Sequence, residues 1–386
     1  MTRKSLIRGC ISNSRTLCVV QAMEALWNRV ALYGAAAVAI TTAQVWADTP
    51  KPQGRAASAP PEGGMVLLAQ IQLSQHGGIG FDDLLYTPAL DRVLAPAGNM
   101  DALELIDPST RMVTPFKNSP HASQPFRGRH DDGMTSADAD GEWAFAIDRT
   151  SKSLLTFSAK QGTLVSRIGL SAGPDYVRYV ASTQELWVTE PGKEQIEVFE
   201  APRAALAKTG PTRLATISVA GGPESLVIDQ QRHCAYAHLW KGKTVVIDIG
   251  TRKILRTYLN GCQGSRGIAL DTEKRFVFAG CSEGRVAVLD EKQAGKVVAS
   301  ASTSAGVDII AYNPQLRHLY APGASDGQMS VFSVASSGIL HELGRAPTAV
   351  GAHCVTADHR GQVWVCDPDR GRVLVFKDDY GATPSQ

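Results

Sequence analysis

The sequence lacks the features that mark several large functional classes. Its 386 residues carry a formal net charge of only +2, and aromatic side chains make up 6 % of the chain. A protein that binds nucleic acid mainly through phosphate contacts needs a basic surface, so the charge argues against that class. The chain contains no P-loop, no G-x-S-x-G and no C-x-x-C pair, and no crossover helix follows the loop Gly77–Gly80. What it does contain, 44 % hydrophobic residues with 36 Gly and 20 Pro, is typical of a globular protein with many turns and short strands.

Residues 1–47 have the composition of a cleavable export signal. A basic segment is followed by an uncharged stretch, residues 30–47, with small side chains at Val45 and Ala47. We expect cleavage after Ala47; an uncleaved membrane anchor is the alternative, and translation starts at either Met1 or Met23. Without residues 1–47 the chain holds 34 basic and 36 acidic residues, a charge of about −2. The sequence therefore predicts a periplasmic or secreted monomer with no transmembrane span in the mature protein.

A repeated unit of short strands occupies most of the remaining chain. Residues 265–290 read as an apolar strand, a tight polar turn at 271–274, a second strand at 275–279 and a third at 285–289, with room for a fourth at 296–300. Four antiparallel strands in about 42 residues form one propeller blade. The same pattern recurs seven times, and the copies open at Asp83, Asp132, Asp175, Glu224, Arg266, Asp308 and His353.

Two further motifs accompany these repeats. The third strand ends in a turn in which Asp-x-x-Thr/Ser is followed by Lys or Arg, best seen at residues 106–111 and 247–253, and Gly-Pro-Asp/Glu precedes two of the first strands at Pro174 and Pro223. With these motifs the region 65–376 resembles the YVTN/YncE-like propeller family. The resemblance implies an all-β, seven-bladed propeller; it does not imply one reaction, because that family shares none. Some members have been linked to DNA, which the charge of this chain disfavours.

The last copy stops after its third strand, which would leave a long sheet edge exposed. The apolar segment 65–73 precedes the first copy and has no other assignment. We expect it to supply the missing outer strand and close the ring. The predicted organisation is a signal peptide at 1–47, a flexible Pro-, Ala- and Gly-rich linker at 48–64, a propeller at 65–378 and a disordered tail at 379–386.

Five cysteines lie outside the export signal, and an oxidising compartment favours pairing. Cys354 and Cys366 are equidistant from the hairpin turn near Arg360, and Cys262 and Cys281 lie at the same rim of the fifth copy. We therefore predict the disulfides Cys262–Cys281 and Cys354–Cys366, with Cys234 buried and free. The alternatives are that all five are small apolar core residues, or that His353, Cys354 and Cys366 bind a metal.

The first strand of each blade lines the central channel, so the seven opening residues are expected to meet at one mouth. We predict that Asp83, Asp132, Asp175, Glu224, Arg266, Asp308 and His353 bind a ligand there, and that Asp175, Glu224, Asp308 and His353 hold a divalent metal ion. Converging carboxylates repel one another unless their pKa values rise, cationic side chains join them or a cation binds. The triplet His130–Asp132 also resembles a ligand set, but neighbouring residues alternate in direction and cannot all face one ion.

Three functions follow from this ring. The first is a periplasmic propeller that binds a small molecule, a metal ion or an envelope protein at the mouth. The second is a metal-assisted lactonase, hydrolase or lyase, and lactonase-like and lyase-like propellers resemble this arrangement. In that case a carboxylate beside His353 would act as general base. The third is a scaffold whose outer loops bind other envelope proteins. A purely structural role for the opening residues, through hydrogen bonds between blades, is the alternative to all three.

Overall fold

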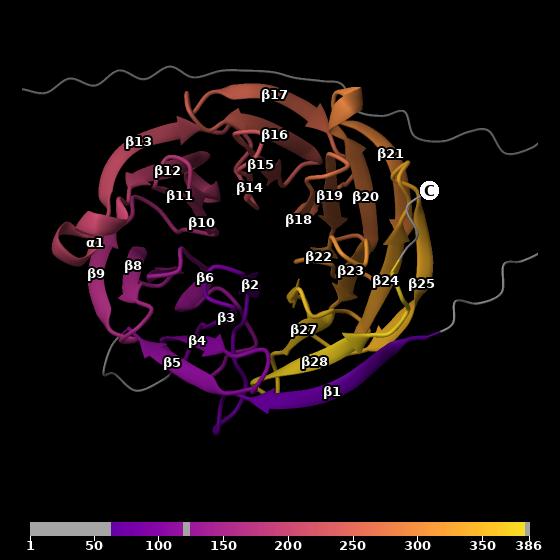
Figure 1. The fold of residues 1–386 in the computed structure, drawn as a ribbon, viewed down its shortest axis with the longest axis horizontal. Coiled ribbons are helices and arrows are strands. Elements are labelled where there is room, and N and C mark those ends of the chain that lie inside the picture. Colours follow the sequence, from indigo (N-terminus) through magenta and orange to yellow (C-terminus); the bar gives the residue numbers. More distant parts are fainter. Residues whose placement is uncertain (1–62, 119–123, 383–386) are drawn as a thin grey trace, which may run out of the picture. The chain divides into compact units, whose positions relative to one another are not determined.

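The computed structural model describes residues 63–118 and 124–382, and these residues form a ring of seven four-stranded antiparallel sheets (Figure 1). The all-β, seven-bladed propeller predicted from the repeats is confirmed. The predicted signal peptide, residues 48–62 of the linker and residues 383–386 of the tail lie outside the described residues. No helix in the described ranges is long and apolar enough to cross a bilayer.

The first four blades follow the chain from the inner strand outwards. Blade 1 contains β2 (Leu85–Thr87), β3 (Arg92–Ala97), β4 (Ala102–Ile106) and β5 (Val113–Lys117). Blade 2 contains β6 (Met134–Ala139), β7 (Trp143–Asp148), β8 (Ser153–Ser158) and β9 (Leu164–Gly169). Blade 3 contains β10 (Val177–Val180), β11 (Glu185–Glu190), β12 (Gln195–Glu200) and β13 (Thr212–Ser218), with the 3-10 turn η1 (Pro191–Lys193) and helix α1 (Arg203–Thr209) in its connections. Blade 4 contains β14 (Val227–Asp229), β15 (Cys234–Leu239), β16 (Lys243–Asp248) and β17 (Ile254–Leu259).

The remaining blades repeat this order until the last. Blade 5 contains β18 (Ser265–Asp271), β19 (Phe276–Cys281), β20 (Arg285–Asp290) and β21 (Lys296–Ser302), with the 3-10 turn η2 (Glu291–Gln293). Blade 6 contains β22 (Ala311–Asn313), β23 (His318–Gly323), β24 (Gln328–Val334) and β25 (Leu340–Pro347). Blade 7 contains β26 (Val355–Ala357), β27 (Gln362–Asp367), β28 (Arg372–Asp378) and, as its outer strand, β1 (Met65–Gln72).

The burial of the strands follows from this radial arrangement. Each blade is covered on both faces by its neighbours, so its second strand is buried along almost its whole length; β19 and β27 are buried at every residue. The outer strands face solvent on one side, and β9 alternates between half-buried and exposed residues. This difference explains why the second strands read as continuous apolar runs and the outer strands as alternating ones.

An acidic or amide side chain fixes the turn after the first strand in several blades. The Asp271 carboxylate accepts a hydrogen bond from the Lys274 amide at 2.8 Å, and the Asn313 side-chain oxygen accepts one from the Leu316 amide at 3.0 Å. Side-chain-to-backbone bonds of this kind hold the backbone in a tight turn. The polar turn predicted at residues 271–274 is therefore confirmed, together with its physical cause.

The N-terminal strand closes the ring, as the apolar segment 65–73 predicted. Strand β1 pairs antiparallel with β28, from Met65 opposite Asp378 to Gln72 opposite Arg372, and Figure 1 shows this indigo strand lying along the yellow end of the chain. Ile71 is buried in the core, whereas residues 66–68 are exposed on the outside. The edge that blade 7 would otherwise expose is thus covered.

Removing β1 tests whether this pairing stabilises the whole ring. We expect a chain beginning at Ser74 to lose about 3 kcal/mol or more of unfolding free energy, since deleting the Ile71 side chain alone corresponds to about 2–5 kcal/mol. A chain beginning at Gly63, which keeps β1, is the matched control and should unfold at the midpoint of the full chain. Denaturant unfolding measures both; equal midpoints for the two truncated chains would contradict the closure.

Candidate functional site

A cavity of about 500 Å³ opens at one end of the ring, and we call it the mouth cavity. The segments that enter the first strands line it, as do turns between second and third strands. Its titratable and aromatic lining residues are Asp82, Phe126, Arg129, His130, Arg149, Asp175, Tyr176, Glu224, Trp240, Arg266, Asp308 and His353. One end of the propeller therefore gathers acids, imidazoles, guanidinium groups and an indole around a single hollow.

Five of the seven predicted ring residues line this cavity: Asp175, Glu224, Arg266, Asp308 and His353. The other two do not. The Asp83 carboxylate accepts hydrogen bonds from Arg178 at 2.9 Å and Ser136 at 2.8 Å, and the residue lines a separate small cavity along the inner strands. Asp132 lines a third cavity, beside Asn99 and Arg167.

Asp82 and His130 stand in the mouth cavity where Asp83 and Asp132 were expected. Asp82 lies ten residues before its second strand β3, the same spacing that separates Asp175, Glu224, Arg266 and Asp308 from β11, β15, β19 and β23, so Asp82 is the equivalent position. Because Asp82 and Asp83 are both acids, the sequence pattern did not show that the opening residue is Asp82 rather than Asp83. A shift of one residue along a strand points the side chain in the opposite direction. The expectation that residues 130–132 cannot share one target is consistent with the structure, since only His130 lines the mouth cavity.

Arg149 and Trp240 are residues that the sequence reasoning missed. Both come from turns between second and third strands, and these turns do not belong to the repeated openings of the first strands. The Arg149 guanidinium donates to Asp82 at 2.8 Å, to Asp175 and to the Pro174 carbonyl at 3.0 Å. It thereby joins this turn of blade 2 to the openings of blades 1 and 3.

Backbone hydrogen bonds between blades hold the ring residues in place. The Gly267 amide donates to the Asp308 carbonyl at 2.6 Å, and the Ile309 amide donates to the His353 carbonyl at 2.9 Å. A Cβ atom at Gly267 would lie 2.3 Å from the Asp308 oxygen, so only glycine allows this approach. The openings of blades 5, 6 and 7 are thus fixed to one another by their main chains.

Half of the mouth cavity consists of acids paired with arginines. Arg149 pairs with Asp175, and Arg266 pairs with Glu224. Burial raises the pKa of Asp175 to about 7, although Arg149 opposes the rise. Burial and repulsion by Asp175 raise the pKa of Glu224 to about 9, despite its ion pair with Arg266. The raised pKa values mean that ionising Asp175 and Glu224 is unfavourable in a buried cavity that already holds other acids.

The other half contains two imidazoles and two carboxylates. His130 Nδ1 lies 3.5 Å from Asp82 Oδ1, and the contact with Asp82 raises the pKa of His130 to about 9. Burial opposes ionisation of Asp82, but Arg149 and His130 together hold its pKa below the ordinary value. Burial and the nearby Asp82 raise the pKa of Asp308. The rings of His130 and His353 are neighbours, with centroids 4.7 Å apart.

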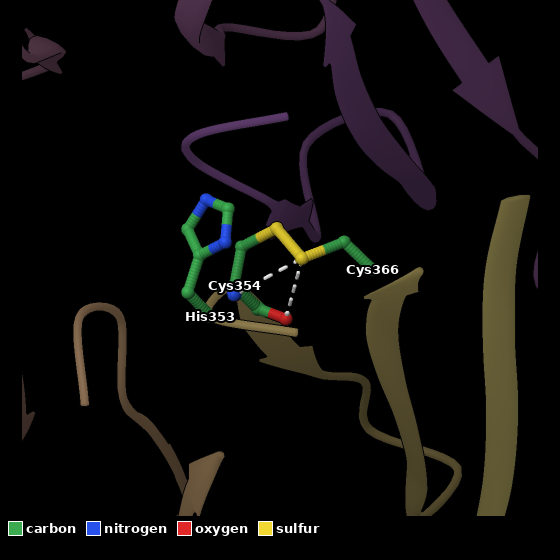
Figure 2. Close-up of side chains that lie close together, drawn as sticks. All are labelled: His353, Cys354 and Cys366. Carbon is green, nitrogen blue, oxygen red and sulfur yellow. Dashed lines mark hydrogen bonds between the residues drawn. A yellow bond between two sulfur atoms is a disulfide. The ribbon is translucent and has the colours of Figure 1, made fainter. Parts of the chain in front are cut away.

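The structure contains both predicted disulfides, Cys262–Cys281 and Cys354–Cys366. Figure 2 shows the second one beside the His353 imidazole, with the Cys354 amide donating to Cys366 Sγ at 3.1 Å. Because these sulfur atoms are bonded to each other, they do not serve as thiolate ligands with His353. Cys234 is free, as predicted, but it is half-buried rather than buried because it begins β15 at the surface end of the strand.

Replacing Cys354 and Cys366 together by Ala should lower the unfolding free energy by about 2–4 kcal/mol, because the cross-link restricts the unfolded chain. Guanidinium unfolding under non-reducing conditions measures this. The control is Cys234→Ala, which removes a cysteine without breaking a cross-link and should change stability by less than about 1 kcal/mol. Equal effects of the two changes would show that the disulfide contributes nothing.

Glu224 predicts a pH dependence of stability whose sign follows from its raised pKa. A carboxyl group that keeps its proton in the folded state, facing Arg266, Asp175 and Asp308, stabilises the fold below its unfolded pKa of about 4.5 and loses that contribution as the pH rises towards about 9. Glu224→Gln removes this loss. Its Tm should therefore rise relative to the unaltered protein between pH 5 and pH 8.5, with roughly 2–4 °C for each kcal/mol.

The exposed Glu273 on the opposite face provides the control, since its side chain is 80 % exposed. Glu273→Gln should show a Tm difference from the unaltered protein that varies little over this pH range. If the Glu224→Gln difference is also constant, or falls as the pH rises, the assignment of a raised pKa to Glu224 is wrong.

No protein-family model and no curated protein matches the sequence. Solved structures do match in fold. One is titled "Kuenenia stuttgartiensis Hydrazine Synthase", with a TM-score of 0.62 and 13 % identity, covering 79 % of this chain and 96 % of that chain. Another is titled "Crystal Structure of Mitotic Checkpoint Complex", with a TM-score of 0.62 and 10 % identity, covering 88 % of this chain and 98 % of that chain. At these identities the similarity is one of fold alone, and the YVTN/YncE-like resemblance stays a prediction.

Proposed function

We propose that this protein is an exported β-propeller that binds a small ligand or ion in the mouth cavity. The observation that carries the proposal is the convergence of four carboxyl groups, two imidazoles and three guanidinium groups on one hollow of about 500 Å³. Cavities that bind small molecules fall in the range of about 300–1,000 Å³ and present a few convergent polar groups. A concave, highly charged surface favours a small polar ligand or an ion over a protein partner.

Arg266 and Trp240 are the groups best placed to contact an organic ligand. Arg266 is 39 % exposed, and its only hydrogen bond to described residues is the one to Glu224. Trp240 is 50 % exposed, lines the same cavity and accepts a backbone hydrogen bond from Ser265, next to Arg266. A guanidinium group with N–H groups to spare, in the same cavity as a half-exposed indole, is suited to a ligand with a carboxylate and a flat or aliphatic body.

Export is the second part of the proposal. Two disulfides are characteristic of proteins that mature in an oxidising compartment, and residues 1–47 have the composition of a signal peptide. A periplasmic or secreted location agrees with both observations.

One observation favours catalysis as the second candidate. Asp175 has a pKa of about 7 in the mouth cavity, which suits a general acid or base at neutral pH. A hydrolase or lactonase acting on a ligand bound beside Asp175 would use it to activate water. Turnover of lactones or esters that disappears in Asp175→Asn would support this candidate over binding alone.

A ligand panel tests the binding function. The purified protein is heated with small carboxylic acids, amino acids, aliphatic and aromatic amines, and divalent cations, each at millimolar concentration. We expect at least one class to raise the Tm, because a ligand that binds only the folded state stabilises it. For an organic ligand, Arg266→Gln and Trp240→Ala should weaken binding at least about tenfold by calorimetry.

Glu273→Gln, on the opposite face, should leave the affinity unchanged. If no class binds, or if an organic ligand binds Arg266→Gln and Trp240→Ala as tightly as the unaltered protein, the mouth cavity is not the binding site of that ligand.

A further inference from the structure

Four side chains in one half of the mouth cavity are close enough to share one ion. Asp82, His130, Asp308 and His353 each offer one ligand atom, and these atoms all lie within 4.8 Å of one another. They come from blades 6, 7, 1 and 2, which are consecutive around the ring. The set is mixed, with two imidazoles and two carboxylates.

The histidine contacts leave a place for a cation. His353 Nδ1 lies 2.6 Å from the Gly351 carbonyl oxygen, which fixes it as the N–H donor. His353 Nε2 then lies 3.0 Å from a second carbonyl oxygen, that of Phe81. With Nδ1 as the donor, Nε2 is the nitrogen available to a metal ion, and the positive charge of that ion would also attract the Phe81 carbonyl oxygen. A backbone carbonyl on the far nitrogen is the usual support for a metal-binding imidazole.

The Asp308 and Asp82 carboxylates differ in their partners. No described residue donates a hydrogen bond to the Asp308 carboxylate, nor does one form an ion pair with it, although the residue lines a cavity that also holds the Asp82 carboxylate. Arg149 approaches Asp82 through one oxygen, Oδ2, while Oδ1 faces His130. An ion between Asp82 and Asp308 would neutralise both, with Arg149 holding Asp82 from behind.

We propose that Asp82, His130, Asp308 and His353 form a binding site for one divalent transition-metal ion, of the kind that zinc, iron(II) or cobalt(II) occupies. This inference rests on the proposed function and names the class of ion that the mouth cavity takes. Two imidazoles with carboxylates favour these ions over calcium and magnesium, which take oxygen ligands. Ligand atoms of a tetrahedral zinc ion are about 3.3–3.6 Å apart, so small side-chain movements complete the site.

This donor set differs from the one predicted from the sequence. Asp308 and His353 are common to both. Asp175 and Glu224 are instead engaged by Arg149 and Arg266 in the other half of the cavity. Asp82 and His130 replace them. Asp82 lies one residue before the predicted Asp83, and His130 lies two residues before the predicted Asp132.

Titration of the chelator-treated, dialysed protein with zinc and cobalt(II) chlorides tests the site. We expect one equivalent of Zn²⁺ to bind, and Co²⁺ to give the visible absorption of a nitrogen- and oxygen-ligated ion. His130→Gln and Asp308→Asn should each weaken Zn²⁺ binding at least about tenfold in calorimetry. His130 is 47 % exposed, so its replacement leaves the core intact.

Two variants serve as controls. His341→Gln removes an exposed histidine from the outer strand β25, and Glu273→Gln removes a carboxylate whose side chain is 80 % exposed and lies outside the mouth cavity. Both should bind Zn²⁺ within about threefold of the unaltered protein. Preserved binding in these two with loss in His130→Gln and Asp308→Asn would establish the donor set.

Three results would overturn the inference: no binding of Zn²⁺ or Co²⁺, binding that survives both His130→Gln and Asp308→Asn, or preferential binding of Ca²⁺. If these occur while an organic ligand of the panel still binds and depends on Arg266 and Trp240, only the metal site is wrong. If neither metal nor organic ligand binds, the proposed function fails as well.

Discussion

The pairing of β1 with β28 is the interaction on which the rest of the structure depends. Only a closed ring gives every blade two neighbours, and only then can the second strands be apolar on both faces without exposing them. Closure also creates the mouth cavity, because it brings the start of the repeat region against its end. Asp82 opens blade 1 and His353 opens blade 7, so the proposed metal site lies across the seam of the ring. The strand pairing that closes the ring at the outer edge of blade 7 therefore also brings together the residues of the binding site at the axis.

The mouth cavity handles the repulsion between its acids in two different ways. On the side of blades 3 to 5, each carboxyl group has an arginine partner, and the remaining electrostatic cost appears as the raised pKa values of Asp175 and Glu224. On the side of blades 6, 7, 1 and 2, Asp82 shares Arg149 with Asp175, and the other basic groups beside the carboxylates are the imidazoles of His130 and His353. An imidazole can give up its proton to a metal, whereas a guanidinium group cannot, so the two sides differ in what they can bind. This division places an ion on one side and leaves Arg266 and Trp240 for an organic ligand on the other.

The fold was predictable because its signals are local and repeated. The Asp271–Lys274 turn, the apolar second strands and the unassigned strand at 65–73 each follow from a few neighbouring residues, and the symmetry of Cys354 and Cys366 about Arg360 gave their pairing. The site was less predictable, since it depends on side-chain direction. Asp82 and Asp83 are both acids, and the pattern alone did not decide which one faces the axis. Arg149 and Trp240 reach the mouth cavity from turns, and His130 precedes its strand by four residues, so none of them occupies the repeated position.

Both disulfides lie at the mouth end of their blades, and this links the proposed location to the proposed site. Cys281 ends β19 and Cys366 lies near the end of β27, where the second strands reach the mouth face. Cys354 directly follows His353, so its bond to Cys366 fixes the residue next to an expected metal ligand (Figure 2). A ligand imidazole must be held within a fraction of an ångström to favour one geometry, and its backbone neighbour sets that position. The cross-links therefore act where the chemistry needs rigidity, and an oxidising compartment is the environment in which they persist.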